Sequence, residues 1–346
     1  MPNTVVEAGL SRRSLSKLMM TGAGMLTFSR GLTGQPLSGE IAVAMTPANF
    51  PQHKAKDIDD MFALGKEVAT GAILIYQWGQ PDFQKVAKTM TELCNKAHLT
   101  PIVSISPTKL EGARNELDVP DKVRQAAKRN LSFKNGDVNK QFAADVFELA
   151  KLKPAYLGLA TEINLLAFKD IKEYIYFAAV CKKLYPEIKK ISPNTKVFVS
   201  FQWDFFHIMA QREPKKIKEH AKLIDIFRPE LDVVALTSYP ADHFSSPSEI
   251  PSDYYSKIYN YVGKSDPVML TEIGWPSSGK GNERSQEQFI LRLPELTNPM
   301  RPLYIGWSLL HDVQVSSFGE ALGTTGVLMK NGKQKPGFAA LKKVRR

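Results

Sequence analysis

The sequence lacks several features that would direct it to other classes of protein. Two cysteines among 346 residues are too few for a disulfide framework, and they stand in no zinc-type spacing. The apolar stretch 18–28 is shorter than the ~20 residues that a membrane-spanning helix needs. The glycines of segment 71–79 do not form a phosphate-binding loop. These absences argue against a disulfide-stabilised miniprotein, a stable membrane span, and an enzyme that depends on a metal or a nucleotide cofactor.

Acidic residues are outnumbered, but only at the two ends of the chain. The formal net charge is +11. Residues 1–35 contain four basic residues and one acidic residue, and the segment from Lys330 contains seven basic residues and no acid. The body between them is therefore nearly neutral, which argues against nucleic acid as a partner. We expect the basic C-terminal segment to be a solvated helix end.

Residues 1–35 are predicted to be a leader. Arg12 and Arg13 precede the weakly apolar stretch 18–28, which two glycines interrupt. This order resembles a bacterial twin-arginine export signal. We therefore predict export to the periplasm or the cell exterior, with a basic leader on a cytoplasmic protein as the alternative. No small-x-small cleavage site follows, so the mature start is not defined.

After the leader, short β-rich runs alternate with longer amphipathic stretches, which is typical of strand–helix units around a parallel sheet. Strict alternation favours a closed barrel over an open sheet. No repeat or low-complexity linker divides the chain, so residues 36–346 are predicted to be one α/β domain, a single (β/α)8 TIM barrel. Cys94 and Cys181 fall on helices that are not neighbours, so we expect no disulfide. The eight predicted strands are 41–45, 73–76, 102–105, 156–160, 197–201, 233–236, 268–270 and 304–307.

Two carboxylates stand at the ends of predicted strands. Glu162 follows the fourth strand and Glu272 follows the seventh. In such barrels functional groups gather at the carboxyl ends of the strands, and the fourth and seventh strands face each other across the mouth. Carboxylates held roughly 5 Å apart can act as proton donor and nucleophile on a glycosidic bond. The sequence therefore predicts a carbohydrate substrate and a reaction that needs no cofactor or metal.

This frame resembles the clan A glycoside hydrolases. The run 271–279, Thr-Glu-Ile-Gly-Trp-Pro-Ser-Ser-Gly, is similar to the nucleophile motif of the family 17 β-1,3-glucanases, and segment 325–338 is similar to the closing segment of the clan. The resemblance implies that Glu272 is the nucleophile, that Glu162 is the general acid/base, and that configuration is retained. It also implies a β-linked polysaccharide or oligosaccharide as substrate, with β-1,3-glucan slightly favoured.

Three further residues follow from the resemblance. Thr161 stands where most of the clan has Asn, whose amide bonds the sugar 2-hydroxyl, and a hydroxyl has less reach. Tyr239, at the end of the sixth strand, would orient Glu272. Trp307, at the end of the eighth strand, would be an apolar platform for the sugar.

The remaining tryptophans and one amide are candidates for neighbouring sugar subsites. Trp78 follows the second strand, Gln202 and Trp203 end the fifth, and Trp275 follows Glu272. All four tryptophans thus fall just after predicted strands, where random core placement would scatter some into helices. For each ring singly, core packing explains the position as well as sugar binding does.

Some alternatives stay open, and one long segment receives no role. A barrel that binds carbohydrate without turnover is compatible with Thr161, and a transglycosylase would use the same covalent intermediate. An aldolase-like barrel would need a Lys at a strand end for a Schiff base, and no predicted strand ends in Lys. Segment 107–136, after the third strand, is longer than most such connections and is given no catalytic role.

Overall fold

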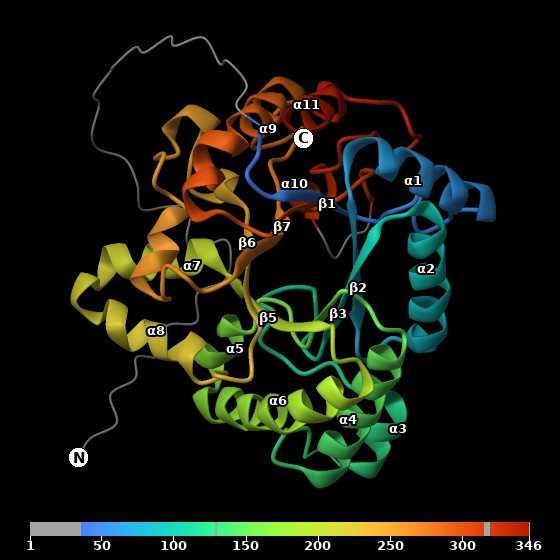
Figure 1. The fold of residues 1–346 in the computed structure, drawn as a ribbon, viewed down its shortest axis with the longest axis vertical. Helices are drawn as coiled ribbons and strands as arrows, with labels where there is room; N and C mark the ends of the chain where they lie inside the picture. Colours follow the sequence, from blue (N-terminus) through green and yellow to red (C-terminus); the bar gives the residue numbers. More distant parts are fainter. Residues whose placement is uncertain (1–35, 129, 315–318, 346) are drawn as a thin grey trace.

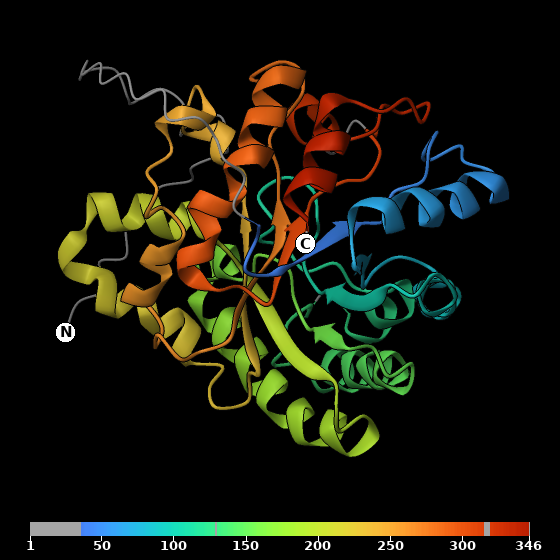
Figure 2. The ribbon, with the colours of Figure 1, turned by 45° about the horizontal axis from the view of Figure 1, so that its top comes forward.

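The computed structural model describes residues 36–128, 130–314 and 319–345, so the predicted leader lies outside the described residues. Eight parallel strands pair in chain order, and β8 returns to pair with β1. The ring of helices around them is visible in Figures 1 and 2. The predicted single (β/α)8 barrel is confirmed. The strands are β1 Glu40–Ala44, β2 Gly71–Gln77, β3 Thr100–Ser106, β4 Tyr156–Gly158, β5 Lys196–Gln202, β6 Val233–Ser238, β7 Val268–Ile273 and β8 Tyr304–Trp307.

The strands are buried on both faces because the barrel is filled inside and covered outside. Inward-facing side chains such as Ile73, Phe198 and Met269 form one small cluster, in which the rings of Tyr156 and Tyr304 meet edge to face. A much larger cluster fills the space between the barrel and its helices. Near-continuous apolar runs are what a parallel sheet with two covered faces requires.

Amphipathic helices cover the outer face of most strands. The connection from β6 to β7 is different, since its described residues form only short 3-10 turns: η3 Pro240–Asp242, η4 Pro247–Glu249 and η5 Ser256–Asn260. Two other 3-10 turns are η2 Pro214–Lys216 and η6 Asn298–Met300. The helices are α1 Ala55–Val68, α2 Phe83–Ala97, α3 Asp121–Ala126, α4 Gly136–Lys151, α5 Asn164–Lys169, α6 Ile171–Ile191, α7 Trp203–Arg212, α8 Ile217–Asp225, α9 Glu283–Thr297, α10 Gly319–Gly323 and α11 Pro336–Val344.

Cys94 on α2 and Cys181 on α6 are buried free thiols, as expected. Burial raises the pKa of Cys94 to about 12, so this thiol is inert at neutral pH. Within the described residues, no helix is long and apolar enough to cross a membrane.

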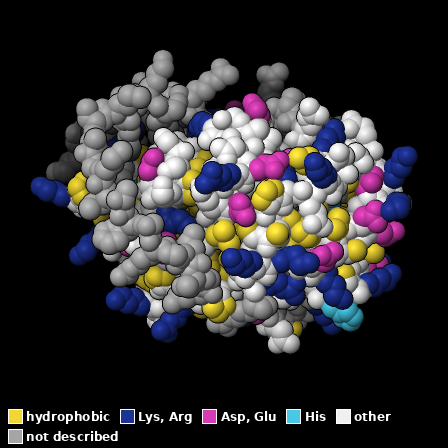
Figure 3. Space-filling model, turned by 90° about the horizontal axis from the view of Figure 1, so that it is seen from above, with side chains coloured by type: hydrophobic (Ala, Val, Ile, Leu, Met, Phe, Trp, Pro, Cys, Tyr) yellow, Lys and Arg dark blue, Asp and Glu magenta, His cyan; other side chains and the backbone are white. Residues whose placement is uncertain are grey.

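Among its described residues, the basic C-terminal segment departs from the expectation at Lys335. Lys342 on α11 is exposed and pairs with Glu67. Lys335 is instead 4% exposed, and its ammonium lies 2.6 Å from an Asp312 carboxylate oxygen. A buried ammonium needs such a partner, and sequence spacing gives no sign of one. On the face shown in Figure 3, Lys and Arg side chains stand among acidic and apolar ones.

Candidate active site

Glu162 follows β4 at a sharp change of backbone direction. Residues 159 and 160 still bond along β5, and Glu162 then takes a left-handed conformation with φ 52°. Its backbone N–H donates to the Ser200 hydroxyl at 3.1 Å. The Thr237 hydroxyl donates to Glu162 Oε1 at 2.7 Å, and the residue is fully buried. A strained, non-glycine conformation at a buried carboxylate is typical of a functional position.

Glu272 lies within β7, three strands away from Glu162. The β6–β7 pairing shifts register between Leu236 and Thr237, and such irregularities commonly redirect side chains beside active sites. The Tyr239 hydroxyl donates to Glu272 Oε2 at 2.8 Å, which is the contact that the sequence predicts. Burial raises the pKa of Tyr239 well above 10, and the Glu272 carboxylate raises it further. Tyr239 therefore remains a protonated donor at all working pH values.

Arg114 joins the two carboxylates. Its Nε lies 3.1 Å from Glu162 Oε2, and its Nη1 lies 4.0 Å from Glu272 Oε1. Since both nitrogens belong to one guanidinium, the two Glu oxygens lie within roughly 9.5 Å of each other, inside the range of catalytic carboxylate pairs in glycosidases. Burial lowers the pKa of Arg114, but both carboxylates raise it, and the net shift is upward. The guanidinium is a fixed cation.

Sequence reasoning missed Arg114, which lies in the segment that was given no role. Residues 108–117 form a hairpin, here called the Arg114 hairpin, in which Thr108 bridges Leu117 and the Lys109 N–H donates to the Glu116 carbonyl. Gly112 (φ 66°) and Arg114 (φ 51°) both adopt left-handed conformations near its tip. The length of the segment was the available signal, because long connections at this end of a barrel commonly carry function.

A buried polar cluster centred on Asp204 holds the backbone of Tyr239. Asp204 accepts hydrogen bonds from the Tyr239 backbone N–H at 2.7 Å, the Ser238 hydroxyl at 2.6 Å and the Tyr254 hydroxyl at 2.6 Å. Burial raises the pKa of Asp204, and these donors oppose that shift. Gln202, predicted as a sugar contact, bonds Asp204 and caps the first turn of α7. Its described contacts are therefore structural.

The tryptophan rings lie in the core and not along a cleft, which corrects the predicted sugar-stacking roles. Trp78 donates to Asp145 and packs on Phe142, and Trp203 meets Tyr254 and Tyr261 edge to face. Trp275 donates to Ser285. All three are 0% exposed. A ring just after a strand can turn outward beneath the helices, where burial against their apolar surface is favourable.

Trp307 also differs from the prediction of a platform. It is 1% exposed, its N–H donates to the Thr325 carbonyl at 2.8 Å, and its ring lies near Phe289 of α9. Thr161 is 2% exposed and lines a narrow space inside the barrel together with Ser200, Thr271 and Glu272. Thr161 and the predicted nucleophile Glu272 thus line the same space.

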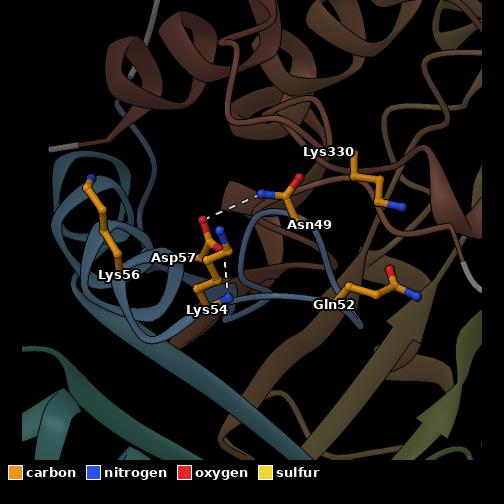
Figure 4. Close-up of a pocket in the computed structure, with 6 residues that line it drawn as sticks. All are labelled: Asn49, Gln52, Lys54, Lys56, Asp57 and Lys330. Atoms are coloured by element: carbon orange, nitrogen blue, oxygen red, sulfur yellow. Dashed lines mark hydrogen bonds between the residues drawn. The ribbon is translucent and has the colours of Figure 1, made fainter.

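A second hollow, of about 570 Å³, is lined by the β1–α1 connection, the first turn of α1, and Lys330 from the segment between α10 and α11 (Figure 4). Much of its polar lining is already paired, since Asp57 accepts from Asn49 and from the Lys54 N–H, and Lys56 pairs with Asp60. We assign it no role. Among the described residues, no group of three or more His, Cys, Asp or Glu is placed to hold a metal ion.

The closed parallel barrel of this chain is similar in fold to solved structures that include glycoside hydrolases. The similar solved structures include a GH5_18 protein from Streptomyces cattleya in complex with GlcNAc, at a TM-score of 0.69 and 14% identity over 90% of this chain and 80% of that one. A GH5_18 protein from Bifidobacterium longum gives 0.65 and 16% over 88% and 78%.

A third similar structure is an exo-β-1,4-mannosidase from an Opitutaceae bacterium, with a TM-score of 0.64 and 12% identity over 91% of this chain and 61% of that one. At these identities the likeness establishes the fold. No family model and no curated protein matches the chain in sequence, so the expected family 17 likeness rests on the 271–279 run alone.

Proposed function

We propose that this protein is a retaining glycoside hydrolase that cleaves a β-linked oligosaccharide or polysaccharide, with Glu272 as nucleophile and Glu162 as general acid/base. The observation that carries the proposal is the joint placement of two buried carboxylates at one mouth of the barrel, close enough for a single guanidinium to contact both. Their positions, after β4 and within β7, are those that the clan A resemblance implies for retention.

The contacts around each Glu fit the two roles. In the first step Glu272 bonds to the anomeric carbon, while Glu162 gives its proton to the leaving oxygen. Tyr239 holds Glu272 Oε2 and so aims the carboxylate. Thr237 donates to Glu162 Oε1, which directs the transferable proton towards Oε2. In the second step Glu162 removes a proton from the water that attacks the anomeric carbon, and Glu272 leaves.

Two indications about the identity of the sugar point to different substrates. The 271–279 motif slightly favours β-1,3-glucan, whereas the similar structures are described with Man-β-1,4-GlcNAc and as a β-1,4-mannosidase. Thr161 departs from the clan A resemblance, because a hydroxyl stands where the resemblance implies an amide that bonds the sugar 2-hydroxyl. Both β-glucans and β-mannosides therefore belong in the first screen.

The test is a screen of the purified protein on β-1,3-glucan, β-1,4-glucan, galactan, mannan and Man-β-1,4-GlcNAc, with Glu272→Gln beside it. Glu148→Gln, an exposed carboxylate on α4, is the matched control. We expect hydrolysis of at least one glycan, loss of roughly 10³-fold or more in Glu272→Gln, and no change in Glu148→Gln. Activity that survives in Glu272→Gln would contradict the nucleophile assignment.

Azide separates the two roles on whichever substrate is found. Glu272→Ala with azide is expected to release the α-glycosyl azide, because azide attacks from the face that the nucleophile has vacated. Glu162→Ala with azide and an aryl glycoside is expected to give the β-azide. Reversed products would exchange the assignments.

Two other functions use the same site. Transglycosylation would appear as products longer than the substrate. Binding of carbohydrate without turnover is favoured by one specific observation, the ion pairs of Arg114 with both carboxylates. Measurable glycan binding by wild type, together with no cleavage of any glycan, would support that function over hydrolysis.

Export is proposed as well, from the Arg12-Arg13 pair and the apolar stretch after it. Replacing both arginines with Lys should retain the protein in the cytoplasm of a bacterium with a twin-arginine pathway. Export of this variant at the wild-type level would contradict the assignment.

A further inference from the structure

We propose that Arg114 is an autoinhibitory latch: its guanidinium occupies the place between Glu162 and Glu272 where the positive charge of the reacting sugar develops, and substrate must displace it. This inference rests on the proposed function, since it concerns the same two carboxylates. It adds a residue and a segment, the Arg114 hairpin, that neither the sequence motifs nor the similar structures assign.

The first support is geometric. One guanidinium lies 3.1 Å from Glu162 and 4.0 Å from Glu272. A sugar ring undergoing cleavage has its anomeric carbon against the nucleophile and its leaving oxygen against the acid. A group that contacts both carboxylates therefore occupies the space that the bond to be cleaved must enter.

The second support is electrostatic. The transition state of glycoside hydrolysis has oxocarbenium character, so positive charge develops beside the carboxylates. Arg114 supplies a permanent positive charge at the same place. A sugar ring that gains positive charge cannot share this place with the guanidinium, because like charges repel at such a distance. The described arrangement is thus a resting state and not the reactive one.

The third support is the way the Arg114 hairpin is attached. Its outer contacts are the ion pairs of Glu116 with Lys109 and Lys169, and all three side chains are about half exposed. Exposed pairs of this kind contribute little. At the tip, an added Cβ on Gly112 would meet nothing within 4 Å. At the tip itself, residues 111–113 are exposed and Arg114 is 3% exposed, so the ion pairs of Arg114 join the tip to the barrel.

The test uses the full chain and two charge-removing variants, Arg114→Ala and Arg124→Ala. Arg124 lies on α3 in the same connection between β3 and β4 and is exposed, which makes it the matched control. The probes are guanidinium chloride and isofagomine, a piperidine whose ring nitrogen is cationic, together with the mannose-configured analogue of isofagomine. Binding is measured by calorimetry, and thermal unfolding is measured in parallel.

We expect Arg114→Ala to bind a cationic iminosugar at least about tenfold more tightly than wild type or Arg124→Ala, because the internal competitor is gone. Low millimolar guanidinium should weaken that binding in Arg114→Ala only, and should raise its unfolding temperature relative to sodium chloride at equal ionic strength. Arg114→Lys should lie between wild type and Arg114→Ala.

Equal or weaker iminosugar binding by a folded Arg114→Ala protein would overturn the latch and make Arg114 part of the binding framework. If wild type cleaves a glycan and this result is obtained, the latch fails while the proposed function stands. If no form of the protein binds an iminosugar or cleaves any glycan, both proposals fail. If Arg114→Ala does not fold, Arg114→Gly is measured instead at reduced temperature. Iminosugar binding by Arg114→Gly that guanidinium does not weaken would equally overturn the latch.

Discussion

The buried ion pair of Lys335 and Asp312 gives a prediction that needs no substrate. The Lys335 ammonium lies 2.6 Å from Asp312, and also donates to the Ser277 hydroxyl at 2.7 Å and the Gly326 carbonyl at 2.8 Å. Ser277 lies in the loop after Glu272, so the ammonium connects that loop to the closing segment of the chain. The perturbation is a cycle of three variants: Asp312→Asn, Lys335→Met and the double variant.

The magnitudes follow from what each variant leaves behind. Asp312→Asn leaves an ammonium in a side chain that is 2% exposed, and an unpaired buried charge costs about 3–5 kcal/mol. Lys335→Met leaves the Asp312 side chain, which is 18% exposed and can be hydrated, so its loss should be smaller, about 1–3 kcal/mol. The double variant removes both charges and should lose less than Asp312→Asn alone, with a coupling of about 2 kcal/mol or more.

Burial raises the pKa of Asp312 and lowers the pKa of Lys335, each against the opposing effect of the partner. Both directions mean that the folded state disfavours the charged forms. For Asp312 the associated stability is complete below about pH 3.8 and is lost as the pH rises through the folded pKa. The assay is urea unfolding of the four proteins at neutral pH. A loss below about 1 kcal/mol in Asp312→Asn, or a double variant as unstable as the sum of the single losses, would refute the reasoning.

Three further predictions concern the site and its surroundings. Tyr239→Phe removes one hydrogen bond to the Glu272 carboxylate and should lower kcat by roughly 10- to 100-fold with little change in KM. A kcat within twofold of wild type would contradict the orienting role of Tyr239. Burial, with Lys257 and His243, lowers the pKa of His207 to about 4. Stability should therefore fall as the pH drops from about 6.5 to about 4, by on the order of 2–3 kcal/mol, and His207→Gln should lose this part of the pH dependence in unfolding titrations. In Gly306→Ala the new Cβ would lie 2.6 Å from the Thr271 carbonyl oxygen, so the free energy of unfolding should fall by about 1–3 kcal/mol. Activity should fall as well, because β7 carries Glu272. A variant with wild-type stability and activity would contradict this prediction.

The fold could be predicted because its signal is repeated eight times along the chain. Each predicted strand overlaps an observed one. The prediction of β4 was two residues longer than the observed strand, although residues 159 and 160 keep backbone hydrogen bonds to β5 ahead of the left-handed turn at Glu162. Boundaries of this kind depend on local backbone geometry, which composition and periodicity do not specify.

The placement of aromatic rings was not predictable in the same way. Three tryptophans follow strands and Trp307 ends β8, but a residue at or just beyond the end of a strand can face either the mouth or the helices. The direction depends on which neighbours offer apolar surface and a partner for the N–H. Asp145 for Trp78 and Ser285 for Trp275 are such partners, and each comes from a helix.

By itself, the sequence determined the eightfold strand–helix order, the single barrel, and the meeting of Glu162 and Glu272 at one mouth, because strand order and strand direction fix which ends converge. Only the tertiary structure decided which other residues contact those carboxylates. Arg114 comes from a hairpin 48 residues before Glu162 in the chain, and Thr237 comes from β6, whereas the contact of Tyr239 with Glu272 was already expected. Such contacts depend on how loops fold back over the barrel, and no local pattern in the chain records that path.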